Sequence, residues 1–193
     1  MRIISGAARG RNLFTLKGFH TRPTADRVKE AVFSVLSDRL AGAVVLDAFA
    51  GSGALGLEAL SRGAEQAVFF ESDRQAAQVC RRNIQQCGLA GCRLIPGDCI
   101  KQLPRLRQSE PELSFDLVFA DPPYNRGLLP RLMDELVRND WLAPSGLLIA
   151  ETTTRDSEFT APIPWEIVKS SAYGSTTVHY CRIRTMEIKE ETP

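Results

Sequence analysis

Hydrophobic residues gather in five short runs along the middle of the chain, at 43–46, 67–70, 93–95, 115–120 and 147–150. The runs are rich in Val, Ile, Leu and Phe, and they do not alternate with polar residues. Continuous hydrophobicity indicates strands covered on both faces, and therefore a mainly parallel sheet with right-handed crossovers. Apolar residues at helical spacing predict helices between these strands, at about 53–62, 73–87 and 128–139.

Two further segments flank these runs. After Pro23, apolar residues from Val28 to Leu40 recur every three or four positions, which predicts a helix with Thr24 as its N-cap and Asp26 in its first turn. Residues 165–169 and 177–184 have the composition of strands, and no helix separates them, so we expect an antiparallel hairpin. The pattern as a whole predicts a doubly wound α/β sheet with an antiparallel edge.

The composition fits one globular domain. Hydrophobic residues at 44% and charged residues at 24% exclude the disordered and fibrous classes. No apolar run approaches the roughly 20 residues that cross a bilayer, and no signal peptide is recognisable, so we expect a soluble, cytoplasmic monomer without a membrane partner. Five cysteines without a CxxC pair, and only two histidines, predict buried reduced thiols and no metal site.

Charge is distributed unevenly, although the formal net charge is only +1. Residues 1–33 hold seven basic and two acidic side chains, so the rest of the chain is mildly acidic. We therefore divide the chain into a basic N-terminal arm or hairpin, residues 1–22, and a compact domain, residues 23–193. Such an arm suits contact with a polyanion, although a solvated basic terminus would have the same composition.

The first strand leads into a glycine-rich turn, where Gly51, Gly53 and Gly56 form G-x-G-x-x-G before a helix. This pattern indicates a nucleotide-type ligand near a helix N-terminus, and a dinucleotide is one candidate. However, Asp47 lies four residues before Gly51 and would repel a pyrophosphate. The same carboxylate would attract the cationic amino and sulfonium groups of S-adenosylmethionine, although a helix-capping turn could also begin this way.

Acidic residues follow the next two strands as well. Glu71 comes 20 residues after Gly51, where a carboxylate can accept hydrogen bonds from both hydroxyls of a ribose. Asp98 follows the third strand, where it can accept from an adenine amino group. Because the carboxyl ends of parallel strands meet at one edge of a sheet, these acids and the glycine loop predict a cofactor site at that edge.

The fourth strand ends in Asp121-Pro122-Pro123-Tyr124. Two prolines fix φ and remove two backbone donors, which leaves their carbonyls directed outward, although a rigid turn alone would use the same residues. The exocyclic amine of a base is a poor nucleophile because its lone pair is delocalised into the ring. The Asp121 carboxylate and the Pro122 carbonyl can accept its hydrogens while Tyr124 stacks on the base, so the motif predicts methyl transfer by positioning and electrostatics.

The order of these motifs resembles that of the class I S-adenosylmethionine-dependent amino-methyltransferases. The resemblance implies a Rossmann-like fold, with a seven-stranded, mainly parallel sheet, an antiparallel last strand and helices on both faces. The chain also resembles the RsmD family more narrowly, through Ile3-Ile4-Ser5-Gly6, Arg9-Gly10-Arg11, Arg22-Pro23-Thr24 with the segment 26–33, and Tyr173-Gly174-Ser175-Thr176. Two departures are Lys29, where Arg is expected, and Ser34-Val35, where Asn-Trp is more common.

The RsmD resemblance implies methyl transfer from S-adenosylmethionine, with S-adenosylhomocysteine as product, to the N2 amine of one guanine in 16S ribosomal RNA, position 966 in that RNA. It implies a small-subunit ribonucleoprotein particle as partner. Asp121, Pro122 and Tyr124 would be catalytic and hold the guanine. The implied cofactor set is Asp47, Phe49, Ala50, Gly51, Ser52, Gly53, Glu71, Ser72, Asp98, Cys99 and Asp121, and the implied RNA-binding set is Arg9, Arg11, Arg22, Thr24, Pro123 and Tyr124.

Three other functions share part of this pattern. An adenine-N6 nucleic-acid methyltransferase would use the same tetrapeptide, but the chain lacks room for a separate DNA-recognition domain. A protein-glutamine methyltransferase usually begins the tetrapeptide with Asn and would give the basic arm no purpose. A non-catalytic RNA-binding assembly factor would need no carboxylate and paired prolines beside a cofactor.

Overall fold

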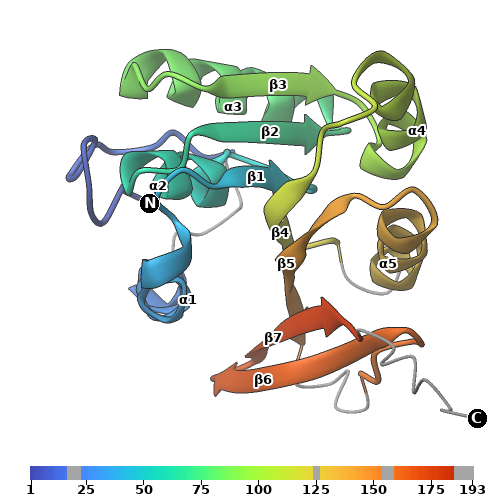
Figure 1. The fold of residues 1–193 in the computed structure, drawn as a ribbon. Helices are drawn as coiled ribbons and strands as arrows, with labels where there is room; N and C mark the ends of the chain where they lie inside the picture. Colours follow the sequence, from blue (N-terminus) through green and yellow to red (C-terminus); the bar gives the residue numbers. More distant parts are fainter. Residues whose placement is uncertain (17–22, 124–126, 154–158, 185–193) are drawn as a thin grey trace, which may run out of the picture.

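The computed structural model describes residues 1–16, 23–123, 127–153 and 159–184, and its strands form one seven-stranded sheet. The strands are β1 (Val44–Asp47), β2 (Gln66–Glu71), β3 (Cys92–Pro96), β4 (Phe115–Ala120), β5 (Leu142–Thr153), β6 (Trp165–Tyr173) and β7 (Thr176–Ile183). Their order is β3-β2-β1-β4-β5-β7-β6 (Figure 1). The first five strands pair in parallel, and β7 is antiparallel to both β5 and β6. The predicted fold class is confirmed.

Helices cover both faces of this sheet, as Figure 1 shows. On one face, α1 (Pro23–Val35), α2 (Ala54–Ser61) and α3 (Arg74–Cys87) enclose a first hydrophobic core. On the other face, α4 (Cys99–Ser109) and α5 (Leu128–Arg138) enclose a second core. A short 3-10 helix, η1 (Ser37–Arg39), follows α1. Successive strand residues enter opposite cores, which explains why the strand sequences are continuously hydrophobic.

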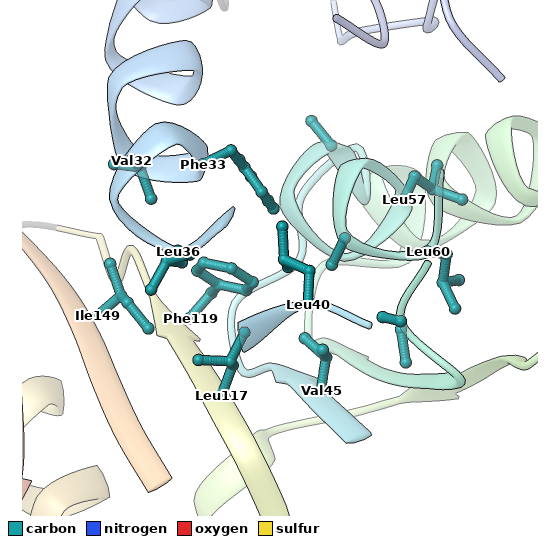
Figure 2. Packing of buried hydrophobic residues seen from close by; sticks show 14 of the residues in the cluster. Val32, Phe33, Leu36, Leu40, Val45, Leu57, Leu60, Leu117, Phe119 and Ile149 are labelled. Atoms are coloured by element: carbon teal, nitrogen blue, oxygen red, sulfur yellow. The ribbon is translucent and has the colours of Figure 1, made fainter. Parts of the chain in front are cut away.

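Helix α1 packs over the centre of the sheet. Figure 2 shows Val32 and Phe33 of α1, with Leu36 directly after it, beside Phe119 of β4 and Ile149 of β5. The ring centroids of Phe33 and Phe119 lie 5.4 Å apart, and all five side chains are buried. This packing fixes α1 above β4, which leads to the predicted catalytic motif, and above its neighbour β5.

Two helices depart from the sequence-based expectation. No helix was expected before the fourth strand, yet α4 occupies Cys99–Ser109 with Pro104 inside it. The proline and the sparse apolar residues hide the helical pattern, although Asp98 caps the helix by accepting a hydrogen bond from the Lys101 N–H. Helix α1 begins at Pro23, one residue before Thr24, which was predicted to be its cap. Proline is suited to the first helical position, because its missing N–H would have no partner there.

Strand β5 is longer than expected, since it extends from Leu142 to Thr153 and not only over 147–150. Its register with β4 pairs Ala120 with Ala150, so β5 continues for three residues beyond the end of β4. Strands β6 and β7 form the predicted antiparallel hairpin, with Gly174 at φ 62° in the turn. Strand β7 of this hairpin therefore pairs with the part of β5 that continues beyond β4.

Residues 1–16 fold back against α2. A backbone bridge joins Arg2 to Asn12, and Ile3, Ala8 and Leu13 are buried in the first core. The buried Glu58 carboxylate on α2 accepts hydrogen bonds from the backbone N–H groups of Ile4 and Ser5, at 2.8 and 3.1 Å. It also pairs with Lys29 at 3.0 Å and with Arg62 at 2.8 Å. The segment is thus held by buried polar bonds as well as by apolar contacts.

Candidate active site at the carboxyl edge of the sheet

Four carboxylates lie along the carboxyl edge of the sheet, on or directly after four neighbouring strands. In sheet order they are Glu71 on β2, Asp47 on β1, Asp121 directly after β4, and Glu151 on β5. Coulombic coupling joins Asp47 to Glu71 and Asp121, and Asp121 to Glu151. The structure therefore brings together three acids predicted from the sequence, and it adds Glu151. The signal for Glu151 was available, because it is an acid that follows a predicted strand, as Asp47, Glu71 and Asp121 do.

The loop from β1 to α2 needs its glycines for identifiable reasons. Gly51 and Gly53 have φ angles of 54° and 79°, in the left-handed region that glycine occupies without strain. The Gly56 N–H donates to Asp47 Oδ2 at 3.0 Å, and a Cβ on Gly56 would lie 2.3 Å from the Phe69 ring. The loop therefore folds tightly around the Asp47 carboxylate at the N-terminus of α2.

Asp47 is a buried acid without a cationic partner among the described residues. Its side chain is 2% exposed, and no Lys or Arg in the described part of the chain forms an ion pair with it. Desolvation raises its pKa to about 7, Asp121 and Glu71 add to the increase, and the Gly56 N–H opposes it. A cation bound here would replace the lost hydration, so the site fits a positively charged ligand group.

Glu71 closes the same loop from β2. Its Oε2 accepts from the Gly51 N–H at 2.7 Å, and its Oε1 accepts from the Asp73 N–H at 2.7 Å. Each carboxylate oxygen has further lone-pair capacity, so these bonds orient the group and still allow it to accept from ribose hydroxyls. Ser72 next to it is exposed.

The remaining predicted cofactor residues frame this loop. The Ala50 N–H donates to the Phe70 carbonyl at 2.9 Å, Phe49 is half-buried, and the Ser52 carbonyl accepts from Asn83 at 2.8 Å. Asn83 was not predicted, because a single asparagine within a helical pattern gives no signal; it is fully buried and its amide also bonds both backbone groups of Phe14. The loop is thereby tied to the N-terminal segment.

Asp98 and Cys99 lie where β3 passes into α4. Asp98 is half-buried as the N-cap of that helix, and Cys99 is 3% exposed. Burial raises the pKa of the Cys99 thiol, so it stays protonated and acts as a small apolar surface. A pocket of about 460 Å³ opens on the α3 side of this edge, which is a suitable size for a small ligand. Its lining residues are Glu71, Ser72, Arg74, Ala77, Gln78, Arg81, Pro96 and Gly97.

The predicted catalytic motif begins where β4 ends. Pro122 is buried, whereas Asp121 and Pro123 are exposed. Although the Asp121 side chain reaches solvent, the protein around it removes part of its hydration and raises its pKa to about 6. Tyr124 lies outside the described residues. The part of the motif that is described places a carboxylate beside both the cofactor loop and β5.

Two of the predicted RNA-binding arginines, Arg9 and Arg11, do not lie beside this motif. Arg9 and Arg11 are exposed on the N-terminal segment, where the Ala7 N–H bonds the Ser61 carbonyl at the end of α2. Arg11 also donates to the Gln86 carbonyl near the end of α3, at 2.8 Å. In a parallel α/β sheet these helix ends lie toward the amino edge, opposite the strand ends that carry the acids. Arg22 and the side chain of Thr24 lie outside the residues that the structure describes.

Neither a metal-binding cluster nor a membrane-spanning helix occurs in the described part of the chain. Residues 1–16, 23–123, 127–153 and 159–184 contain no group of three or more metal-ligating side chains. No helix in those same ranges is long and apolar enough to span a membrane.

Known proteins resemble this chain over most of its length. The family model described as conserved hypothetical protein 95 matches residues 1–182. Ribosomal RNA small subunit methyltransferase D from Haemophilus influenzae is 38% identical over 176 residues, covering 90% of this chain and 89% of the relative. The protein of the same name from Escherichia coli (strain K12) is 36% identical over 174 residues, covering 90% and 85%.

A solved structure extends the likeness to the fold. The structure of yhhF from Escherichia coli superposes with a TM-score of 0.82 at 32% identity, covering 95% of this chain and 97% of that one. The superposition therefore includes almost the whole of this chain. By its family model, its relatives and its fold, the chain belongs to the RsmD family of class I methyltransferases.

Proposed function

We propose that this protein transfers a methyl group from S-adenosylmethionine to the N2 amine of a single guanine in 16S ribosomal RNA, at position 966 of that RNA. The substrate is a small-subunit ribonucleoprotein particle in the cytoplasm. The named relatives, at 36–38% identity, are ribosomal RNA small subunit methyltransferases, which supports ribosomal RNA as the substrate class. The choice of guanine N2 rests on the family resemblance, because the acceptors described below would serve an adenine amine equally well.

The observation that carries the proposal is that the four carboxylates at the carboxyl edge form one row, here called the acidic row. Its two halves lie next to each other. Asp47 and Glu71, with the glycine loop between them, form the cofactor half. Asp121 and the following prolines form the amine half on the neighbouring strand β4. Because Asp47 and Asp121 are close enough to perturb one another, a donor on the first half would meet an amine on the second.

The cofactor half fits S-adenosylmethionine by charge and hydrogen bonding. Asp47 is a buried carboxylate that lacks a cationic partner among the described residues, so it suits the amino or sulfonium group. Glu71 would accept from the ribose hydroxyls, and Asp98 would accept from the adenine amino group while Cys99 packs beside it. When bound, the cofactor supplies an activated methyl group, so the protein itself need only bind, orient and accept hydrogens.

The amine half would orient the nucleophile. The Asp121 carboxylate and the Pro122 carbonyl accept the two hydrogens of the exocyclic amine, which directs the nitrogen lone pair toward the methyl carbon. When the nitrogen–carbon bond formed and the carbon–sulfur bond of the methyl donor broke, the nitrogen would become more acidic and one of its hydrogens would leave as a proton. Asp121, with its pKa raised to about 6, is a suitable first acceptor at neutral pH. Tyr124 would stack on the base after it leaves its own helix.

Product mapping tests the proposal. Labelled S-adenosylmethionine is offered to naked 16S ribosomal RNA and to partly assembled small subunits from cells that lack this protein, and the labelled nucleotide is identified by mass spectrometry. We expect N2-methylguanine at one position, with the particle preferred over naked RNA. Label on adenine N6 would favour the adenine-N6 alternative, and binding without label would favour an assembly factor.

A further inference from the structure

We propose that Glu151 is the residue that selects guanine, because it accepts a hydrogen bond from the N1–H of the target base. This inference rests on the proposed function and extends it from the amine to the neighbouring edge of the base. Asp121 and the Pro122 carbonyl provide for the amine hydrogens alone, and adenine and guanine both have such an amine. A third acceptor is therefore needed to distinguish them.

Glu151 stands next to Asp121 because of the sheet register. Ala120 on β4 is the partner of Ala150 on β5, so the residue after each alanine occupies the next level of the same two strands. Neighbouring strands lie about 4.8 Å apart, which is within the width of a base edge. Phe119 and Ile149, two residues before these acids, share the core under α1 (Figure 2). Strand alternation then directs Glu151 to that same face, and the charge of Asp121, directly after β4, acts on it.

The hairpin of β6 and β7 orients the Glu151 carboxylate. Glu151 pairs across the sheet with Val178, and the Thr176 hydroxyl at the start of β7 lowers the pKa of its carboxyl group. Thr176 belongs to the Tyr173-Gly174-Ser175-Thr176 segment, which the proposed chemistry otherwise leaves without a role. This interaction gives a threonine at the turn of the hairpin an influence on the substrate half of the site.

The surroundings of Glu151 leave it without a compensating charge. It is half-buried, and no lysine or arginine among the described residues forms an ion pair with it or with Asp121. Desolvation raises its pKa to about 7, the Asp121 charge adds to the increase, and the Thr176 hydroxyl opposes it. A row of hydrogen-bond donors on a ligand would relieve this repulsion.

Guanine presents such a row, and adenine does not. The N1–H and the two N2 hydrogens of guanine lie side by side, and carboxylates are acceptors. Beside the N6 amine, adenine presents the N1 lone pair, which a carboxylate would repel. In the sheet order, Asp121 next to the cofactor half receives the amine, and Glu151 one strand further out receives N1–H.

The test compares two RNAs that carry the same amine. Small-subunit particles are assembled with either guanine or 2-aminopurine at the methylated position; 2-aminopurine keeps the 2-amine but has a lone pair at N1. We expect the wild-type protein to prefer guanine by at least about tenfold in kcat/KM. Glu151→Gln should reduce this preference to within about threefold or reverse it, because the amide can donate to the N1 lone pair.

Controls separate this role from a folding defect. Glu112→Gln makes the same change at an exposed carboxylate before the amino end of β4 and should leave the preference unchanged. Thr176→Val should lower the preference, while Thr176→Ser should retain it, and every variant should bind S-adenosylmethionine as the wild type does. An unchanged guanine preference in Glu151→Gln would contradict the inference alone. A wild-type protein that transfers no methyl group to guanine would contradict the proposed function, and the inference with it.

Discussion

At the scale of single residues, Asp47 illustrates how a simple sequence pattern gains physical detail. Its position four residues before Gly51 was enough to predict a carboxylate beside a cationic ligand. The structure adds that this carboxylate is almost fully buried, bonded by the Gly56 N–H, and flanked by two further acids. Its protonation must therefore be coupled to the arrival of the cofactor.

We predict that cofactor affinity rises with pH through about 7. Desolvation raises the Asp47 pKa to about 7 in the free protein, and a bound cation lowers it again, so binding near pH 7 releases protons. Calorimetry at pH 6 and pH 8, in buffers of different ionisation enthalpy, measures both effects. Asp47→Asn should bind more weakly and with a flatter pH profile; an affinity independent of pH in the wild type would contradict this account.

The same raised pKa affects the stability of the ligand-free protein with the opposite sign. An unfolded aspartate ionises near pH 4, whereas the folded Asp47 keeps its proton until about pH 7. Between these values the unfolded state has lost the proton, so this group makes the free energy of unfolding fall as pH rises. Bound cofactor should remove that decline.

Residues with a local signature could be predicted, and residues whose role depends on tertiary neighbours could not. Glu71 and Asp121 follow recognisable strands, so their shared edge followed from parallel pairing. The role inferred for Glu151 also needs the knowledge that β5 lies beside β4 and outlasts it by three residues. Asn83 connects Ser52 to Phe14 across the fold, which no single stretch of sequence could indicate.

At the scale of elements, the docked N-terminal segment explains a glycine that the family resemblance only noted. Gly6 has φ +84°, and a Cβ there would lie 1.6 Å from the Ser61 carbonyl oxygen. The adjacent Ala7 N–H donates to that same carbonyl at 2.7 Å. The close approach of this segment to the end of α2 therefore requires a residue without a side chain.

We predict that Gly6→Ala lowers the free energy of unfolding by about 2 kcal/mol or more, because it adds a backbone clash to an unfavourable φ. Gly10→Ala is the matched control. Gly10 has φ +81°, yet its Cβ would meet nothing within 4 Å, so only the conformational cost of about 1 kcal/mol should remain. Urea unfolding measures both, and equal losses would show that the contact with α2 contributes nothing.

Strands were easier to predict than helix α4. The five central strands are continuous apolar runs, and each lies within a few residues of its predicted position, although β5 is much longer. In α4 only Cys99, Leu103 and Leu106 are buried, and Pro104 interrupts the pattern. The helix is held by its Asp98 cap and by the second core, which is a tertiary contribution that the sequence pattern does not reveal.

At the scale of the whole molecule, Arg9 and Arg11 lie away from the strand ends that carry the acids, although Phe14 of the same segment is tied to the cofactor loop through Asn83. Arg11 bonds the carbonyl of Gln86 near the end of α3, whose first residues lie at the cofactor edge. Asn83, three residues before Gln86 on that helix, bonds the Ser52 carbonyl of the cofactor loop. We expect an RNA bound at the active site to meet these arginines through its phosphates and not through the target base.

We predict that reversing Arg9 and Arg11 to Glu weakens RNA binding and reduces the dependence of log affinity on log salt by about two. The loss should shrink as salt rises, and transfer to a short oligonucleotide that holds only the target region should be unaffected. Reversing the exposed Arg131 and Arg138 of α5 is the control for net charge. A loss that does not depend on salt would indicate misfolding.

The central claim is that one acidic row has a cofactor half and an amine half, and the Asp121→Ala variant tests it most directly. Cofactor affinity by calorimetry and methyl transfer to particles lacking the modification are measured on the same preparation, beside Asp47→Ala. The account predicts that Asp121→Ala binds S-adenosylmethionine nearly as the wild type does and transfers no methyl group, whereas Asp47→Ala binds it weakly. Full transfer by Asp121→Ala, or unchanged affinity in Asp47→Ala, would contradict it.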